Sequence, residues 1–458
     1  MLYEDIKLSR ECMKKGLLFF FTSLFFLEWN DIGVKAFGPL YGKSLSMILM
    51  LIFLLVNIKR LSRIWLTKWE IVATVTLLVE FIRGIEVAIT NENYEGISRF
   101  VNGYLGIIIF YMGVKLCYPR LHDRSFRQQL VKTLYNGCFY STCFMGGLQI
   151  MYILTGNRVL YAVIDELTFR GLTYLDAGKV QLFTEPSLFG EIFFIVFIPS
   201  AYYVLKNGIY KKNRVLISAA IVLLINILGI SVRFILDMLV FIAIWCLFTI
   251  YAGRGSKVVK TLLFVMLFSV FSYGILYFNW FGLAEQNHAI ERLHNILTSS
   301  NYTSLDESGS IRMEYLRCAW NGFVQKPILG WGAGNYVSAL NANAHRIGNA
   351  LADAELLAAC QQKNMVSFSF IFTQLCENGM IGVIHVTNVL YLLVRMIGKK
   401  NSIIMNTVSL FIVYMFIQNE MMGCFSIAMV LAFYNFNNLT VNRYGDTENG
   451  LIKIGVRK

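Results

Sequence analysis

Apolar residues follow this chain in long blocks that are separated by short polar segments. About 20 consecutive apolar residues form a helix long enough to cross a hydrocarbon layer about 30 Å thick. The pattern therefore predicts an all-α polytopic membrane protein with about twelve transmembrane helices. The expected spans are about 16–28, 43–58, 69–89, 97–116, 130–154, 187–206, 214–230, 233–252, 258–280, 370–395, 402–418 and 423–440. The tenth span is expected to begin with an irregular portion before Asn378-Gly379, which favours a separate short helix there.

Two polar segments are longer than connectors between membrane helices need to be. They divide the chain into a bundle of about nine spans (1–280, with an outer loop at 155–186), a large loop domain (281–369), the last three spans (370–440) and a tail (441–458). The first 150 residues carry no motif of known chemistry.

Composition supports a membrane protein, and charge predicts its orientation. Of the 458 residues, 56% are apolar and 15% are charged, whereas soluble proteins carry about 25% charged residues. Lysines and arginines gather between alternate spans, which by the positive-inside rule places these loops and both termini in the cytoplasm. The large loop domain then lies outside. The net charge of +13 is explained by this distribution and not by one basic face, so nucleic acid is not an expected partner.

The nine cysteines form no CxxC motif and no metal-type spacing with histidine, so no metal site is expected. Cys318 and Cys360 share the large loop, where a free pair is expected rather than a disulfide.

Several ionisable residues fall within the expected spans or at their outer ends. Charges at membrane depth are costly, so they usually pair or line a polar cavity. Glu80 and Arg83 are three residues apart, and Arg233 and Asp237 are four apart, so each pair shares a helix face. Simple neutralisation within a helix and a polar cavity that opens outward are both compatible with this spacing. The full set is Glu28, Glu80, Arg83, Glu86, Glu185, Glu191, Arg233, Asp237, Glu377 and Glu420.

Four short motifs occur in the second half of the expected bundle, in the large loop and at the start of the last three spans. They are Glu-Pro-Ser at 185–187, Ser-x-Arg at 231–233, R…W…P-x-L-G-x-G-x-G at 312–334, and L-x-E-x-G-x-x-G at 375–382. Taken together and in this order, they resemble the O-antigen ligase and polymerase superfamily, which includes the Wzy-type polysaccharide polymerases. The resemblance covers about residues 185–382 and the general topology.

The resemblance implies a GT-C-like glycosyltransferase in the bacterial cytoplasmic membrane. Such an enzyme joins undecaprenyl-diphosphate-linked repeat units into O-antigen, capsule or exopolysaccharide, needs no cofactor or nucleotide sugar, and is independent of metal. The implied partners are the lipid-linked glycan donor and acceptor and membrane lipids; a chain-length-regulating co-polymerase is left open. Ligases of the superfamily carry a histidine near the end of the large loop. Residues 361–369 hold none, which favours the polymerase over the ligase. A lipid-linked oligosaccharide flippase is the alternative from another class, and its usually short loops argue against it.

The chemistry assigns roles to particular residues. Guanidinium groups hold phosphate oxygens through paired hydrogen bonds and stay charged, so Arg233 and Arg312 are expected to stabilise the departing diphosphate. Glu185 is the expected base for the attacking hydroxyl; its alternative is a plain helix N-terminus. The expected substrate-binding residues are Arg317, Arg170, Arg83, Arg346, Trp320, Gly332, Gly334 and Glu377. Packing is the alternative role of Trp320, and a plain turn is the alternative role of the glycines.

Overall fold

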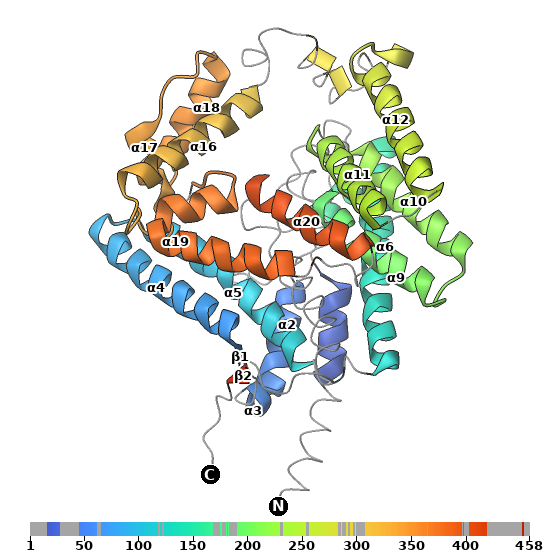
Figure 1. The fold of residues 1–458 in the computed structure, drawn as a ribbon, viewed down its shortest axis with the longest axis horizontal. Helices are drawn as coiled ribbons and strands as arrows, with labels where there is room; N and C mark the ends of the chain where they lie inside the picture. The colour runs from blue at the N-terminus through green and yellow to red at the C-terminus, as the bar shows by residue number, and fades with distance from the viewer. Residues whose placement is uncertain are drawn as a thin grey trace, which may run out of the picture.

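The computed structural model shows a predominantly helical protein (Figure 1). It describes residues 16–27, 45–61, 66–117, 120, 123–167, 175, 180, 182, 190–229, 232–252, 256–282, 285, 290–291, 294–295, 298, 307–363, 365–395, 397, 403–418 and 451–452.

Most helices follow the apolar blocks of the sequence, but those at 158–167, 307–325, 336–343 and 350–361 lie within the two segments that were expected to be outer loops. The helices are α2 (Leu45–Val56), α3 (Ile58–Leu61), α4 (Lys68–Thr90), α5 (Tyr94–Leu116), α6 (Arg124–Thr155), α7 (Arg158–Leu167), the π-helix η3 (Phe193–Phe197), α9 (Ile198–Lys206), α10 (Lys212–Leu228), α11 (Val232–Ala252), α12 (Ser256–Leu276), the 3₁₀ turn η4 (Trp280–Gly282), α16 (Glu307–Gln325), α17 (Tyr336–Asn343), α18 (Ala350–Gln361), α19 (Phe370–Arg395) and α20 (Ile403–Gln418). Two short strands, β1 (Leu66–Thr67) and β2 (Leu451–Ile452), pair antiparallel.

Four helices of the described part of the chain are long and apolar enough to cross a membrane. They cover Tyr94–Leu116, Arg124–Thr155, Arg233–Tyr251 and Val259–Leu276. The expectation of a helical membrane protein is therefore supported, but twelve spans exceed the number that these criteria give. Other expected spans contain helices that are too short, such as α2 with 12 residues, or too charged, such as α4. The span expected at 423–440 lies outside the described residues.

Local chemistry sets several helix ends. Thr67 and Glu70 form a reciprocal capping box that starts α4, and this arrangement satisfies two backbone N–H groups that the first turn leaves without partners. Helix α6 ends at Gly156 with φ +62°. Helix α19 is broken at Gly379, where φ is +56°, which confirms the irregularity expected at Asn378-Gly379.

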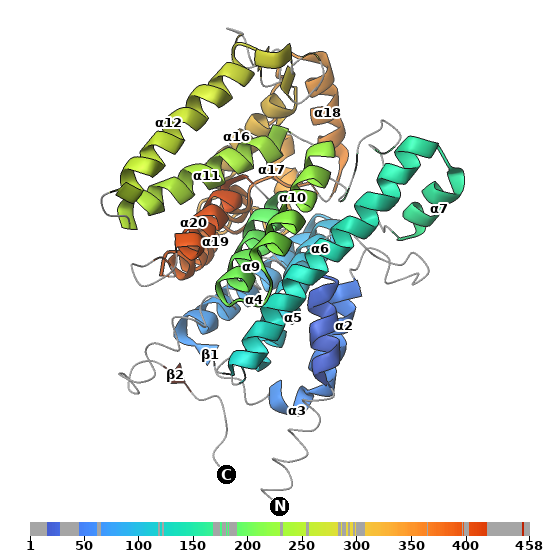
Figure 2. The same ribbon diagram turned by 90° about the vertical axis from the view of Figure 1, so that its right-hand side faces the viewer.

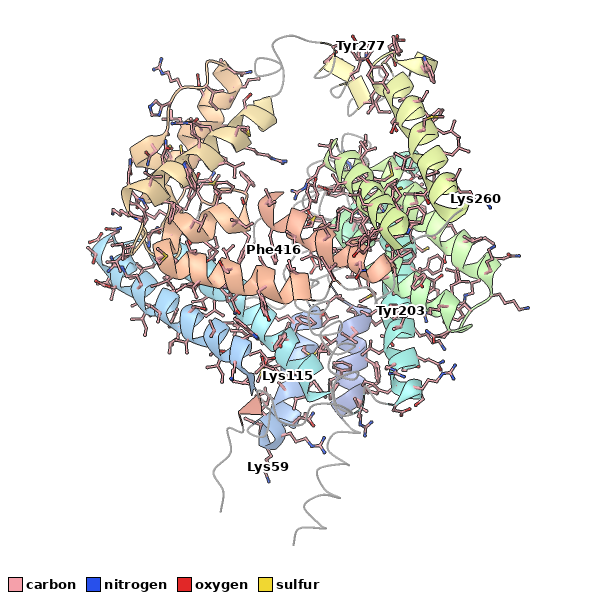
Figure 3. All side chains as sticks on the ribbon, in the orientation of Figure 1. Lys59, Lys115, Tyr203, Lys260, Tyr277 and Phe416 are labelled. Atoms are coloured by element: carbon pink, nitrogen blue, oxygen red, sulfur yellow. The ribbon has the colours of Figure 1, made fainter. Side chains whose placement is uncertain are left out.

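The helices form a central bundle, and smaller groups of elements lie at its two ends. In both views α16, α17 and α18 stand at one end, whereas α3, β1 and β2 lie at the other (Figures 1 and 2). Lys59 and Lys115 lie toward the second end, and Tyr277 lies at the first (Figure 3). Lys59 and Lys115, from two of the expected inner segments, therefore lie far from α16–α18, which belong to the expected outer segment, whereas Lys260 of another expected inner segment lies higher, on α12 (Figure 3).

The described part of the expected loop domain has a hydrophobic core of its own. Buried residues from α16, α17 and α18 pack together with Cys376 of α19. A larger core joins the helices of the bundle. The loop helices are therefore folded onto α19 as a packed unit, and this unit fixes where the polar side chains of α16 can reach.

Candidate functional site

Arg233 lies in the first turn of α11 and is 8% exposed. Its Nη2 atom is 2.6 Å from Oε1 of Glu191, which precedes η3, and its Nε atom is 3.9 Å from Oδ2 of Asp237. The Arg233–Asp237 pair expected from sequence is therefore present, but Glu191 supplies the shorter ion pair. One guanidinium thus sits between two buried carboxylates.

Two further helices reach the same carboxylates. The hydroxyl of Tyr414, on α20, donates to Oδ1 of Asp237 at 3.1 Å. Arg312, on α16, is close enough for its charge to act on Asp237, and its guanidinium lies 5.7 Å from the ring centroid of Phe368. The two arginines that sequence singles out for catalysis therefore act on one buried carboxylate, although 79 positions separate them in the numbering.

The charges in this cluster are balanced but incompletely hydrogen-bonded. Nε and Nη2 of Arg233 and Oδ2 of Asp237 take part in the two ion pairs described above, but within the described part of the chain none of these atoms has the geometry of a hydrogen bond. Buried polar groups normally have such partners, and their absence calls for an explanation such as a ligand. An anionic ligand could take guanidinium hydrogen bonds here, while a neighbouring carboxylate accepts a proton.

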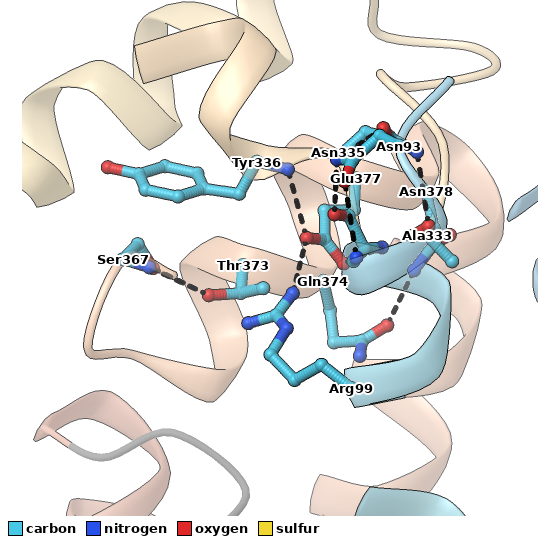
Figure 4. A network of polar contacts seen from close by, with 12 residues as sticks. Asn93, Arg99, Ala333, Asn335, Tyr336, Ser367, Thr373, Gln374, Glu377 and Asn378 are labelled. Carbon is cyan, nitrogen blue, oxygen red and sulfur yellow. Dashed lines mark hydrogen bonds and ion pairs between the residues drawn. The ribbon is translucent and has the colours of Figure 1, made fainter. Parts of the chain in front are cut away.

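The glycine-rich segment 328–336, here called the glycine turn, is bound to the kink of α19 (Figure 4). Gly330, Gly332 and Gly334 have φ values of +64°, +92° and +80°, which residues with a Cβ rarely adopt. Oε2 of Glu377 accepts from the Gly334 N–H at 2.9 Å, and its Oε1 accepts from the Tyr336 N–H at 3.1 Å. The backbone N–H of Gly332 donates to the Glu377 carbonyl at 2.7 Å.

Arg99, on α5, completes this arrangement, because its Nη2 donates to Oε1 of Glu377 at 2.9 Å. Glu377 is only 1% exposed. Its carboxylate therefore holds the glycine turn in place, and this geometry favours the plain-turn alternative for Gly332 and Gly334. The motifs at 312–334 and 375–382 are brought into direct contact.

Arg317 joins α16 to the end of α17. Its guanidinium makes two hydrogen bonds to Glu314 at 2.5 and 2.7 Å and one to the Asn343 carbonyl at 2.7 Å. Burial alone would raise the pKa of Glu314, but the hydrogen bonds from Arg317 and from the His345 N–H outweigh it and lower that pKa. Arg317 is engaged within the loop domain in this conformation.

The remaining expected residues are dispersed. Arg83 pairs with Glu86 at 2.5 Å and not with Glu80, so the expected Glu80–Arg83 pair is wrong. Arg346 is exposed, and Trp320 is 49% exposed. Glu185 and Arg170 lie outside the described residues. Cys318 and Cys360 are both free, as expected.

Sequence reasoning missed four partners. Arg99 and Tyr414 were not singled out, Glu191 was noted only as a charge within a span, and His385 was not considered. His385 Nδ1 lies 2.9 Å from Oε1 of Glu80, and both side chains are buried. The available signal was a charge at the end of an apolar block (Arg99) and a histidine inside one (His385).

No group of residues in the described ranges is arranged to hold a metal ion. Neither a known family model nor a curated protein matches the sequence.

Proposed function

We propose that this protein is a membrane glycosyltransferase of the Wzy type that polymerises lipid-diphosphate-linked oligosaccharide units on the outer face of the cytoplasmic membrane. The observation that carries the proposal is the convergence of Arg233 and Arg312 on Asp237. Contact between the glycine turn and the Glu377 segment is a second support, because it joins two of the four motifs that suggested the superfamily.

The reaction follows from the groups that meet at Asp237. An acceptor hydroxyl attacks the anomeric carbon of the donor sugar, the bond from that carbon to the diphosphate oxygen breaks, and the lipid diphosphate leaves. Arg233 and Arg312 stabilise the charge that develops on the departing oxygen. A carboxylate takes the hydroxyl proton. Glu185 is the candidate from sequence, and Glu191 and Asp237 are carboxylates already in place beside Arg233.

The proposal includes a GT-C-like bundle of about twelve spans with both termini inside. It places the end of the molecule that carries Lys59 and Lys115 in the cytoplasm and the α16–α18 end outside. It also holds that the donor and the acceptor are both lipid-linked glycans, that membrane lipids surround the bundle, and that no cofactor takes part. A ligase, which transfers finished polymer to another lipid, is the alternative within the same chemistry.

A transporter of lipid-linked oligosaccharides is the second candidate, and one observation favours it. Two ion pairs and a buried glutamate–histidine contact lie at successive positions along α4, α5 and α19, and transporters use such groups for coupling. The pairs are Glu70–Lys115, Glu80–His385 and Glu377–Arg99. The folded, arginine-bearing loop domain is what favours the polymerase.

Deletion of the gene in its own organism, followed by gel analysis of surface glycan, separates these functions. Loss of a polymerase leaves single repeat units, loss of a ligase leaves lipid-linked polymer, and loss of a transporter leaves units trapped inside. Complementation with Arg312→Lys keeps the charge but removes paired hydrogen bonding, so we expect single repeats. Normal ladders from both Arg312→Lys and Arg233→Ala would refute the assignment of these arginines.

Orientation has an independent test. Met313 on α16 is 67% exposed, so a Met313→Cys variant should react with a membrane-impermeant thiol reagent on intact spheroplasts. A Lys59→Cys variant, at the opposite end, should react only after permeabilisation. Reversed labelling would place α16 in the cytoplasm and exclude the proposed reaction.

A further inference from the structure

Phe368 is the central residue of a short segment that precedes α19, residues 367–369, here called the serine turn. Its φ angle is +58°, in the left-handed region that is uncommon for residues with a Cβ and an outlier for bulky ones. Asparagine accepts this conformation because its side chain can hydrogen-bond locally, whereas a phenyl ring offers no such compensation. Strain of this kind persists only where the surroundings impose it, and it is typical of functional sites. The ring of Phe368 is therefore the part that needs a reason.

Buried hydroxyl groups hold the backbone on both sides of Phe368. Ser367 Oγ donates to the Ser369 carbonyl at 3.1 Å, and the Ser367 N–H donates to Oγ1 of Thr373 at 3.3 Å (Figure 4). Ser369 Oγ donates to the Phe416 carbonyl of α20 at 3.4 Å. Both serines are fully buried. These contacts do not use the Phe368 side chain, so the shape of the turn fixes the direction in which the ring points.

The ring contacts two side chains of α16. Its centroid lies 5.4 Å from that of Tyr315, with the ring planes 23° apart, and 5.7 Å from the guanidinium carbon of Arg312. Arg312 and Tyr315 are three residues apart, so they share a helix face. Tyr315 is fully buried, and its carbonyl accepts from the Tyr336 hydroxyl at 2.8 Å. Phe368 therefore packs against a fixed ring and lies within cation–π distance of the guanidinium.

The serine turn is also joined to the arginine site. Phe416, whose carbonyl accepts from Ser369, lies two residues after Tyr414 on α20. The Tyr414 hydroxyl donates to Asp237, the carboxylate on which the charge of Arg312 acts. A cation–π contact favours one position of a long side chain that otherwise has many rotamers. Holding a reacting group in place before substrate binds removes part of the entropy cost of the reaction.

We propose that Phe368 is a positioning residue for the diphosphate site: the strained serine turn places its ring against Arg312, and this contact keeps the guanidinium oriented for the departing diphosphate. The proposal rests on the proposed function, because that function gives Arg312 its role. Plain packing of Phe368 against the core of α16–α18 is the alternative. Packing needs only volume, whereas a cation–π contact needs an aromatic ring.

A double-mutant cycle tests the contact itself, without any substrate. Cys318 on α16 is fully buried, so its rate of reaction with a thiol reagent in the purified full-length protein follows how often the loop helices open. Phe368→Leu keeps the strained backbone but removes the ring. We expect it to speed labelling about fivefold more on its own than in combination with Arg312→Gln, which corresponds to a contact of about 1 kcal/mol. Phe368→Tyr keeps an aromatic ring and should label within about twofold of wild type.

Phe372→Leu is the matched control. It removes another half-buried ring from the same core, one whose centroid lies 6.4 Å from that of Trp320, and it should speed labelling equally with and without Arg312→Gln. If Phe368→Leu also acts equally in both backgrounds, the residue only packs and the proposal is wrong. Should Phe368→Leu fail to fold on gel filtration, Phe368→Met takes its place in the cycle, because methionine fills irregular gaps without a ring.

A second measurement connects the contact to the reaction. The substrate is the lipid-linked repeat unit extracted from a strain that lacks the gene, and polymer formation by the purified protein is followed on gels. Phe368→Leu should lower the rate about fivefold or more, Phe368→Tyr should stay within about twofold of wild type, and Phe372→Leu should leave the rate unchanged. A wild-type rate in Phe368→Leu, or an equal loss in Phe368→Tyr, would refute the positioning role alone. Absence of polymer from the wild-type protein would instead refute the proposed function, and the role of Phe368 in that reaction with it.

Discussion

Replacing Glu377 by alanine should release the glycine turn from α19. The substitution removes the acceptor of two backbone N–H groups and of the Arg99 guanidinium, and all three donors lie at buried or part-buried contacts. Removing one partner of a buried ion pair costs about 3–5 kcal/mol. Arg99 keeps 22% of its side chain exposed, so the lower end of that range is the appropriate figure. At about 1.4 kcal/mol per factor of ten, the open state of the turn becomes about 100-fold more populated.

Thiol labelling measures this opening directly. Cys376 is fully buried, and its carbonyl accepts from the Trp331 N–H at 3.0 Å, so reagent reaches it only when the turn lifts away. When closing is faster than labelling, the rate follows the population of the open state. We therefore expect Cys376 to react about 100-fold faster in Glu377→Ala, as followed by mass spectrometry of individual cysteines. Cys138, buried in the bundle core, should be unaffected.

Two controls define the outcome. Glu86→Ala removes an exposed carboxylate and should leave Cys376 protected. A rate for Cys376 in Glu377→Ala within about threefold of wild type would show that this carboxylate does not hold the turn. A parallel rise at Cys138 would mean global unfolding, which is a different effect.

Three further predictions follow from other contacts. A Cβ on Gly96 would collide with the backbone of the glycine turn, so Gly96→Ala should lower the yield of folded protein on gel filtration. Nothing lies within 4 Å of a Cβ on Gly147, so Gly147→Ala should leave the free energy of unfolding unchanged or raise it by up to about 1 kcal/mol. The lowered pKa of Glu314 means that its contribution to stability is fully present above its ordinary pKa and is lost as pH falls through the lowered value. Glu314→Gln should therefore melt with less dependence on pH as pH falls below the ordinary value of 4.5, and equal dependence there would contradict this assignment. His385→Ala should destabilise the protein by about 3 kcal/mol, because it leaves the buried carboxylate of Glu80 without this partner. Arg83→Ala should stay within about 0.5 kcal/mol of wild type. If thermal melts show the opposite order, the Glu80–Arg83 pair expected from sequence is the correct one.

Spacing along the helix is not enough to predict the partner of Arg83. It has a glutamate three residues before it and another three residues after it, and helix geometry allows either pair equally. The structure selects Glu86, whose side chain is 64% exposed, and leaves the fully buried Glu80 to His385. His385 is 305 positions away, so no spacing rule within one helix could have identified it.

In the candidate site, too, some residues could be identified from sequence and others only from the packing of the helices. Sequence reasoning proposed Arg233 and Arg312 and found the spacing that joins Arg233 to Asp237, because these features depend on motif and helix periodicity. Glu191 was visible only as a misplaced charge, and Tyr414 carried no signal at all. Their place beside Arg233 depends on how η3, α11 and α20 pack together.

The sequence by itself determined where the apolar helices form, the break of α19 at Gly379 and the glycine-rich character of the turn, but not the helices α7, α16, α17 and α18 within the expected loops. These features depend on neighbours within a few residues, through apolar blocks, capping groups and the φ values that glycine permits. Only the tertiary structure decided which charges meet, including Arg99 with Glu377 across 278 positions. A buried charge must find a partner wherever packing brings one, and packing is the sum of many weak contacts between distant segments.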